Sequence, residues 1–307
     1  MGVPLDSSQF VRLFDKNLRE VTENKYNALP SMIPEIYRMI KSDSPWEEFY
    51  NVGAVPDIPE FTGKLSALGI SPGYHTKIEP KEYAGEIQLE RKLLDDKKFG
   101  VFDDAATSLI TSAQRTREKL GARTFSNAFS NAFDFATSEE NLSPCNDSHT
   151  TKSGTSTTTG FDNAGTSAAS KTAVAATRLL MRRFRNDISE RINIGDNLGI
   201  VCPDNLADIF EEINRTPKSL DMAEGNVNMQ AGRYKIITYR LLDDTDTNNW
   251  WMVDLDAMKK DLVWIDRITP EVKRTSDFST YILRIAVYFR CAYGFLDWRW
   301  IFGHSVS

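Results

Sequence analysis

The chain lacks the features of a membrane or exported protein. Its 307 residues contain no apolar run long enough to span a bilayer, which takes about 20 residues. The opening residues, MGVPLDSSQFVRLFDKNLRE, have no apolar centre of the kind that a signal peptide needs. Only three cysteines are present, Cys145, Cys202 and Cys291, and they lie far apart, which excludes a disulfide framework and is typical of a reducing compartment. We therefore expect small buried cysteines and a protein that is made and assembled in the cytosol.

A basic charge balance is also missing. The formal net charge is −6 and the isoelectric point is about 5.3, whereas proteins that grip nucleic acid have a basic balance or a concentrated basic face. The one dense basic cluster, RLLMRRFR, carries Arg178, Arg182, Arg183 and Arg185. Such a run is more often a solvated helix face. Weak contact with a polyanion, independent of its sequence, is left open.

Catalytic and ligand-binding motifs are missing as well. None of G-x-G-x-x-G, G-x-x-x-x-G-K and G-x-S-x-G occurs, which gives no support to a phosphate-binding loop or a nucleophile elbow. Of the three histidines only His149 has a close partner, Cys145, and a zinc site needs a second such pair. The acidic run DDTDTNN, residues 243–249, lacks the glycine and the bidentate glutamate of a calcium loop, so we interpret it as a turn. We expect no metal, no cofactor and no enzymatic activity.

The first third of the chain predicts an arm followed by a long hairpin. Prolines interrupt the apolar pattern of residues 1–46, which is typical of an extended arm. In GEIQLERKL, residues 85–93, apolar and charged residues alternate as in a half-buried strand. Its predicted partner is EEFYNVGAVPDIPEF, residues 47–61, with the turn signal Ser71, Pro72, Gly73 between them.

This hairpin would be on the order of 50 Å long, about the width of a compact body of this size. An isolated two-stranded ribbon is marginal in water. We therefore expect the hairpin to rest on something other than its own domain. A sheet edge folded back on the same body is the alternative.

Residues 103–136 have the periodicity of a long helix. Apolar residues recur at helical spacing at Leu109, Ala113, Leu120, Phe125, Phe129 and Phe133. The phenylalanine row is predicted to be core rather than a cofactor site. Gly121 is predicted to break or kink the helix, because glycine in a helix interior costs about 1 kcal/mol relative to alanine.

The rest of the chain consists of a polar stretch, an α/β region and a group of predicted strands. The stretch TTKSGTSTTTGFDNAGTSAAS, residues 150–170, has the composition of a flexible linker. Residues 171–255 read as helices on both sides of a small mixed sheet, with Asp204 capping the helix NLADIFEEI. The segments DLVWIDRI, STYILRIAVYFRCAYGF and DWRWIFG then alternate as strands. We expect these strands to pack on the 103–136 helix, so that the α/β region is an insertion and the polar stretch lies within one domain.

The order of these parts resembles the major capsid proteins of tailed double-stranded-DNA bacteriophages, which have the Hong Kong 97-like fold. GEIQLERKLLDDKKFG, CNDSHTTKSGTSTTTGFDNAGTSAAS, AATRLLMRRFRNDI, IVCPDNL, DTDTNNWWMVDL and FRCAYGFLDWRWIFG carry the resemblance, which covers nearly the whole chain from about residue 35. It implies an α+β fold, with a spine helix at 101–136. The implied division is 1–46 N-terminal arm, 47–94 extended β-hairpin loop, 95–170 peripheral domain with spine helix and polar loop, 171–255 axial α/β domain, and 256–307 closing strands of the peripheral domain.

The resemblance also implies a function. The protein would be a structural virion protein that self-assembles through hexamers and pentamers into an icosahedral head, enclosing double-stranded DNA without sequence preference. Its expected site of synthesis and assembly is the host bacterial cytoplasm, and scaffolding, portal and decoration proteins are further candidate partners, whereas a membrane is not. The predicted subunit-interface residues are Pro72, Gly73, Tyr74, Lys77, Glu86, Glu90 and Arg91.

Two alternatives are left open by the sequence. An encapsulin-like shell of the same fold would enclose protein cargo and form particles free of DNA. An α/β enzyme with a lid at residues 148–170 would instead have a pocket lined by convergent titratable groups.

Overall fold

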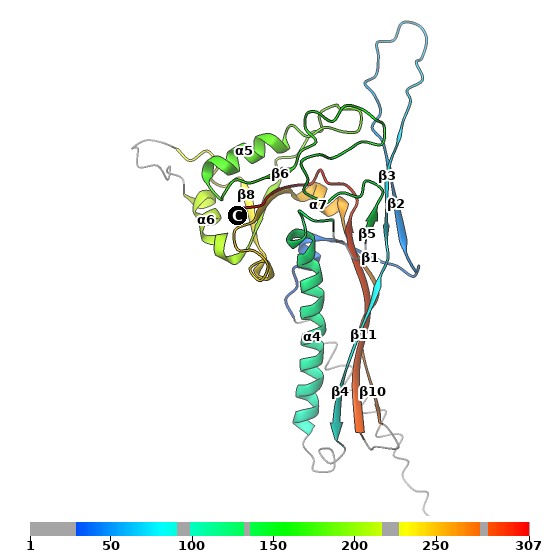
Figure 1. The fold of residues 1–307 in the computed structure, drawn as a ribbon, viewed down its shortest axis with the longest axis vertical. Helices are drawn as coiled ribbons and strands as arrows, with labels where there is room; N and C mark the ends of the chain where they lie inside the picture. Colours follow the sequence, from blue (N-terminus) through cyan, green and yellow to red (C-terminus); the bar gives the residue numbers. More distant parts are fainter. Residues whose placement is uncertain (1–28, 91–98, 132–135, 217–226, 277–281, 307) are drawn as a thin grey trace, which may run out of the picture.

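The computed structural model describes residues 29–90, 99–131, 136–216, 227–276 and 282–306. They form three β-sheets and one long helix (Figure 1). The helices are α2 (Ile33–Ile36), α4 (Phe99–Ser126), α5 (Lys171–Met181), α6 (Asp204–Arg215), α7 (Leu255–Asp261) and the 3₁₀ helix η1 (Arg240–Leu242). The strands are β1 (Arg38–Lys41), β2 (Glu47–Val52), β3 (Pro72–Ile78), β4 (Lys81–Glu90), β5 (Ala136–Ser138), β6 (Ala164–Gly165), β7 (Leu198–Cys202), β8 (Tyr234–Thr238), β9 (Trp250–Asp254), β10 (Leu262–Ser276), β11 (Ile282–Phe295) and β12 (Ile301–His304).

The long helix α4 lies along a four-stranded sheet with strand order β1-β10-β11-β4, as Figure 1 shows. Strand β11 alternates along most of its length, burying Leu283, Ile285, Val287, Phe289 and Cys291. This is the period of two that the sequence predicts for a strand with one covered face. The expectation that the C-terminal strands pack on the long helix is therefore confirmed for β10 and β11.

The long helix departs from the prediction at two places. The helix continues through Gly121. The chain packs closely at this residue, since an added Cβ would lie 2.9 Å from the Tyr239 hydroxyl and 3.0 Å from Ile33 Cγ1. The predicted break is therefore wrong, and the glycine serves close packing. The helix also ends at Ser126, about one turn before Phe129, which stacks on Trp251 outside the helix. Phe133 lies outside the described residues.

A five-stranded mixed sheet forms the second unit, with strand order β6-β12-β9-β7-β8. One of its faces packs with α5 and α6 in a core that includes Val174, Met181, Phe210 and Trp250. The other face packs toward α4, α7 and η1. Strands lie at 198–202, 234–238 and 250–254, which confirms a small mixed sheet in the region where the sequence predicts one.

Three details of this unit correct the prediction. The helix α6 begins at Asp204 itself, and the Asp243 side chain caps it by accepting from the backbone N–H groups of Asp204 (2.9 Å) and Asn205 (3.3 Å). Strand β12 does not join the sheet under α4 but pairs with β9 and β6 in the five-stranded sheet. The polar stretch supplies β6, which pairs with β12.

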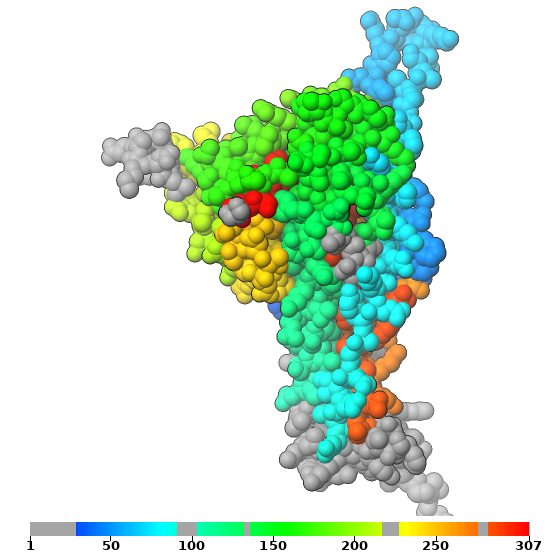
Figure 2. All heavy atoms as spheres, viewed as in Figure 1, coloured from blue at the N-terminus to red at the C-terminus, as the bar shows by residue number. Residues whose placement is uncertain are grey.

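The hairpin has a different pairing from the predicted one. Strand β2 pairs antiparallel with β3, whereas β4 pairs with β11 along its whole length. The prediction that residues 85–93 pair with residues 47–61 is wrong, because the alternation of β4 suits a half-covered edge of the four-stranded sheet as well as it suits a ribbon. The chain between β2 and β3 projects from the body in both views (Figures 1 and 2). We call residues 53–71 the extended loop.

Candidate subunit interface

The extended loop exposes large apolar side chains. Its exposed fractions are 50% for Val55, 87% for Ile58, 68% for Phe61, 86% for Leu65 and 54% for Ile70. The loop contains no strand or helix, and Figure 2 shows it standing clear of the body. A set of exposed apolar groups on one projecting segment marks an interaction surface rather than a solvated loop.

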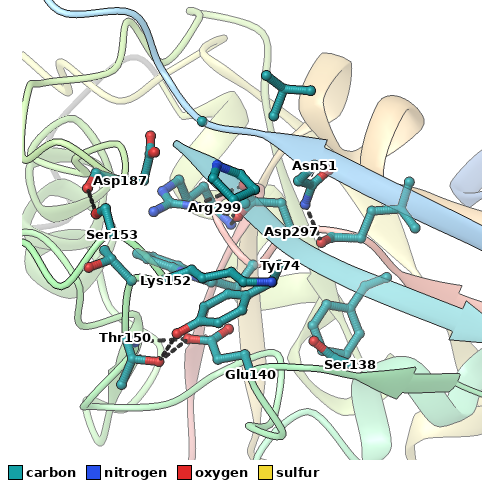
Figure 3. Close-up of a pocket in the computed structure, with 18 residues that line it drawn as sticks. Asn51, Tyr74, Ser138, Glu140, Thr150, Lys152, Ser153, Asp187, Asp297 and Arg299 are labelled. Atoms are coloured by element: carbon teal, nitrogen blue, oxygen red, sulfur yellow. Dashed lines mark hydrogen bonds and ion pairs between the residues drawn. The ribbon is translucent and has the colours of Figure 1, made fainter. Parts of the chain in front are cut away.

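The base of the extended loop is fixed by backbone bonds. Gly53 N–H donates to the Ser71 carbonyl at 2.9 Å, and Ala54 N–H donates to Asp187 Oδ1 at 2.8 Å. A Cβ on Gly53 would lie 2.3 Å from Asp187 Oδ2 and 2.4 Å from the Ser71 oxygen, so only glycine fits. Ser153 holds Asp187 in turn, because its hydroxyl donates to the Asp187 carbonyl at 2.5 Å (Figure 3).

Charged side chains fasten β3 to the polar stretch. Lys152 Nζ donates to both oxygens of Glu139, at 2.7 and 2.8 Å, and His75 Nδ1 lies 2.9 Å from Glu139 Oε2. These hydrogen bonds, that of Lys152 first, lower the pKa of Glu139 to about 2. Beside them the Tyr74 and Thr150 hydroxyls are 2.8 Å apart (Figure 3). The direction of the extended loop is therefore set by contacts with two segments far away in sequence, residues 139–152 and the segment around Asp187.

A cavity lies at this junction, between β2, β3, residues 150–153 and residues 295–299 (Figure 3). Its volume is about 80 Å³, whereas sites for small-molecule ligands span about 300–1,000 Å³. Arg299 on its wall is already paired, with Nη1 3.0 and 2.9 Å from the two carboxylate oxygens of Asp297. The cavity is a packing junction rather than a substrate pocket, and it gives no support to an enzyme with a lid.

The polar stretch is packed, not a free linker. Phe161 and Asn163 are fully buried, and His149 stacks on Trp298 with ring centroids 4.2 Å apart. His149 Nδ1 lies 3.1 Å from Glu140 Oε1, and its Nε2 lies 3.1 Å from Asn163 Oδ1. The composition of the polar stretch predicted a linker because Ser, Thr and Gly dominate. The buried side chains of His149, Phe161 and Asn163 nevertheless hold this stretch against residues 297–304.

Within the described residues no group of three or more His, Cys, Asp or Glu side chains could hold a metal ion. All three cysteines are buried and free. Burial raises the pKa of the Cys202 and Cys291 thiols to about 12 in each case. Nothing in this part of the chain activates a thiol, which would require a lowered thiol pKa.

One carboxyl near the junction has an unusual environment. Asp261 ends α7, and its backbone carbonyl accepts from Leu296 N–H at 2.8 Å. Burial raises the pKa of its side chain to about 7, and the neighbouring charge of Asp297 raises it further. A group that titrates near neutrality therefore lies behind the wall of the junction.

The predicted interface residues fall in two separate places. Pro72, Gly73 and Tyr74 begin β3 and line the junction cavity, and Lys77 further along β3 lies over the Trp46 ring at 4.6 Å. Glu86 and Glu90 belong instead to β4, in the other sheet, where Glu86 Oε1 lies 3.9 Å from Arg284 Nη1. Arg91 lies outside the described residues.

The strongest interface signal comes from residues of the extended loop that the sequence prediction did not single out. The apolar residues of the extended loop have neither a period of two nor a helical period, and they are separated by prolines, as in VPDIPEF. Pattern-based reading treats such residues as loop. The signal that could have found them is the density of large apolar residues in a segment with no periodicity, because a free loop has no reason to carry them.

Similarity to known proteins agrees with this architecture. A family model described as phage capsid protein matches residues 74–303. No curated protein sequence matches the chain. The capsid protein of bacteriophage PhiM1, from its mature capsid, superposes with a TM-score of 0.55 at 11% identity over 91% of this chain and 88% of that one.

Two further solved structures have the same fold. The capsid of a native GTA particle superposes with a TM-score of 0.53 at 13% identity, over 91% of this chain and 92% of that one. A virus-like particle from Pyrococcus furiosus superposes with a TM-score of 0.50 at 9% identity, over 95% and 99%. At such low identities the likeness shows the fold alone.

The long helix on a β-sheet, the separate α/β unit and the projecting loop define the Hong Kong 97-like capsid fold, as the resemblance in the sequence implied. The chain belongs to the phage capsid protein family, whose model covers three quarters of it. It is a structural major capsid protein. None of the described helices is long and apolar enough to cross a membrane.

Proposed function

We propose that this protein assembles through hexamers and pentamers into an icosahedral head that encloses double-stranded DNA. The observation that carries the proposal is the extended loop, whose five large apolar side chains are at least half exposed in the single chain. Such a segment has no cover of its own and gains it from an adjacent copy, because symmetric assemblies repeat one contact on every subunit.

Burial of these side chains would be a substantial contribution to the free energy of assembly. Complete burial of one large apolar side chain contributes roughly 1.5–3 kcal/mol. Because Val55 and Ile70 are already about half buried, the five side chains of one extended loop would contribute roughly 5–10 kcal/mol in gross terms, before the cost of ordering and association is subtracted. A contact of this strength, repeated around a ring, favours closed assemblies over monomers.

The remaining parts of the proposal follow from this arrangement. Residues 171–255 would form the axial domain that meets its copies at the ring centre, together with β6 and β12, which belong to its sheet. The extended loop would take the role predicted for the hairpin at 47–94, since β4 belongs to the four-stranded sheet. Residues 1–46 would be the N-terminal arm, and the rest of 95–170 and 256–307 the peripheral domain. Pro72, Gly73, Tyr74, Lys77, Glu86, Glu90 and Arg91 stay predicted interface residues. We propose a structural role without catalysis, assembly in a bacterial host, and contacts with packaged DNA that do not depend on its sequence, as well as with scaffolding, portal or decoration proteins.

Electron microscopy of the purified protein tests the proposal. We expect hollow particles of uniform size built from rings, and we expect particles from infected cells to contain DNA. Protein that stays monomeric or dimeric under all assembly conditions would contradict it.

A shell around protein cargo is the second candidate. The observation in its favour is the fold similarity to the virus-like particle from Pyrococcus furiosus, although the family match is to phage capsid proteins. Particles that contain protein and no DNA when isolated from their natural source would favour this candidate.

A further inference from the structure

Two oppositely charged surfaces lie on the α/β unit, and the proposed assembly does not yet account for either. The first, which we call the basic face, lies at the end of α5 and consists of Arg178, Leu179, Leu180, Arg182 and Arg183. The second, the acidic face, consists of the carboxylates at the start of α6 and in the turn after η1: Asp204, Asp208, Asp243, Asp244 and Asp246.

The basic face has the composition of a protein interface. Leu179 is 49% exposed and Leu180 is 41% exposed, although both flank arginines on a helix whose other side is fully packed. Arg178 Nε is buried without a hydrogen-bond partner. Arginine beside exposed apolar groups is enriched where two proteins meet, whereas a surface that only binds phosphate has no need of leucines.

The sequence that carries the basic face supplies no counter-charge of its own. Residues 177–185 contain four arginines and no acidic residue. Arg182 pairs with Asp196, whose side chain is 89% exposed, so the pair is largely solvated. Such an exposed pair contributes little energy and can be exchanged for a better one.

The acidic face is held together by the fold. Asp243 accepts hydrogen bonds from the backbone N–H groups of Asp204 and Asn205, which fixes the turn against the first residues of α6. Asp208 and Asp244 are exposed, and Arg240 is the one basic residue among residues 239–249. The carboxylate of Asp243 is therefore held in a fixed position against the first turn of α6, the helix that carries Asp204 and Asp208.

Within the described residues, no ion pair joins the basic face to the acidic face. The basic face is on α5, and α6 packs on the same side of the five-stranded sheet. The turn that carries Asp243, Asp244 and Asp246 follows η1, which packs on the other side through Leu242. The first residues of α6 are held against this turn by their hydrogen bonds to Asp243. Figure 1 shows α5 above the sheet and the gold segment around residues 240–248 below it, with the extended loop rising on the same upper side as α5. Opposite charges on two separate surfaces of one subunit suit a head-to-tail contact around a rotation axis, in which one surface meets the other on the next copy.

We propose that the basic face of each copy docks on the acidic face of the next copy around the ring. The proposal rests on the proposed function and deepens it, because it names the surfaces that choose the neighbour. Leu179 and Leu180 supply apolar contact, while the arginines and carboxylates fix orientation and register, since complementary charge gives specificity more than raw affinity. The same neighbour receives the extended loop, which points to that side.

Charge reversal tests this docking. One variant carries Arg182→Glu with Arg183→Glu, a second carries Asp208→Lys with Asp244→Lys, and a third carries all four changes and so keeps the net charge of the wild type. We expect each one-sided reversal to lower the yield of rings and particles by at least about tenfold, because like charges then face each other. The fourfold variant is expected to recover most of that yield, because its two faces are complementary again.

The readouts are particle yield by sedimentation, ring formation by native mass spectrometry, and subunit folding by circular dichroism. The single substitutions Arg183→Glu and Asp244→Lys, and the variant that combines them, repeat the test with fewer changes to each face and therefore less risk of unfolding. One-sided variants that assemble like the wild type would overturn the docking. So would a folded fourfold variant that assembles no better than either parent.

Two other outcomes are decided by the same samples. Particles of Arg182→Glu with Arg183→Glu that form in normal yield but hold less DNA would show that the basic face binds a polyanion instead, and would overturn the docking. If the wild-type protein forms no ring or particle, both the proposed function and the docking are contradicted. If the wild type assembles and the charge-reversal variants assemble equally well, only the docking is contradicted.

Discussion

Arg117 and Asp266 form a buried, bidentate ion pair between α4 and β10. Arg117 Nη1 donates to Asp266 Oδ1 at 2.7 Å, and Nη2 donates to Oδ2 at 3.0 Å. The two side chains are 4% and 9% exposed. Trp264 Nε1 donates to the same Oδ1 at 3.0 Å, and the guanidinium lies over the Trp264 ring. This cluster joins the long helix to the sheet that it covers.

Replacing Arg117 by alanine should destabilise the subunit by about 3–5 kcal/mol, because Asp266 is left as a buried charge without its counter-ion. Arg117→Lys should cost less but not restore stability, since an ammonium cannot make both parallel hydrogen bonds. The free energy of unfolding of the unassembled subunit in urea measures both. Arg115→Ala on the same helix is the matched control, because Arg115 is exposed and makes one long bond to Ser112. A change below about 1 kcal/mol for Arg117→Ala would contradict the argument.

A second prediction concerns the close approach at Gly121. In most helices glycine to alanine stabilises by up to about 1 kcal/mol, but here the added methyl meets the Tyr239 hydroxyl at 2.9 Å and Ile33 at 3.0 Å. We expect Gly121→Ala to destabilise by about 1–3 kcal/mol, as overpacking does. Combining it with Tyr239→Phe should recover part of the loss in a double-mutant cycle of thermal unfolding. Gly85→Ala is the control, because nothing lies within 4 Å of its added Cβ. A loss of stability in Gly85→Ala as large as that in Gly121→Ala would contradict the explanation.

Much of the fold could be predicted because its signals are periodic. The alternation of β11 and the helical spacing of α4 each identify one covered face, and the structure covers those faces with each other. Strand pairing could not be predicted in the same way. The alternation of β4 says that one face is buried but not which strand lies beside it, and its neighbour β11 comes nearly 200 residues later.

The candidate interface could be predicted only in part. The sequence predicted a projecting hairpin at 47–94 that includes the extended loop, but its predicted turn, Ser71 to Gly73, lies at the base of that loop. The exposed side chains of the extended loop have no period that marks them. The anchors of the polar stretch were hidden for another reason. His149, Phe161 and Asn163 are single residues in a polar background, and their partners Glu140 and Trp298 become neighbours only in the folded chain. Gly121 was misread because propensity is a local quantity, whereas the contact with Tyr239 is not.

A third prediction tests the extended loop. Ile58→Ser combined with Phe61→Ser should leave the unfolding free energy of the isolated subunit within about 0.5 kcal/mol, because both side chains are exposed there. Particle yield should fall strongly, since the cover that these groups gain from a neighbour is lost. Lys64→Gln, a polar change on the same loop, should assemble normally. Equal yields for the apolar and polar variants, measured by sedimentation, would argue against the extended loop as an interface.

A fourth prediction concerns the anchor of that loop. Asp187→Ala removes the acceptor of the Ala54 N–H bond. We expect faster hydrogen exchange at residues 53–55 in the unassembled subunit, with little change along α4. Particles should form with lower yield or less uniform size, because the direction of the loop is no longer fixed. Asp57→Asn, on the loop but outside the junction, is the control, and unchanged exchange at residues 53–55 in Asp187→Ala would remove the anchoring role.

The last prediction follows from the raised pKa of Asp261. Unfolded, this carboxyl ionises from its ordinary pKa of 3.8, but in the folded subunit burial and the charge of Asp297 raise its pKa to about 7. Between these values the folded state binds the extra proton, so this group's contribution to stability is complete below about pH 4 and is lost as pH rises through 7. Asp261→Asn should remove that loss and stabilise the subunit at pH 8 by on the order of 1–3 kcal/mol relative to the wild type. Urea unfolding from pH 4 to 8 should show a smaller decline for the variant than for the wild type, with exposed Asp57→Asn behaving like the wild type. Parallel curves for wild type and Asp261→Asn would mean that the folded carboxyl ionises as readily as the unfolded one.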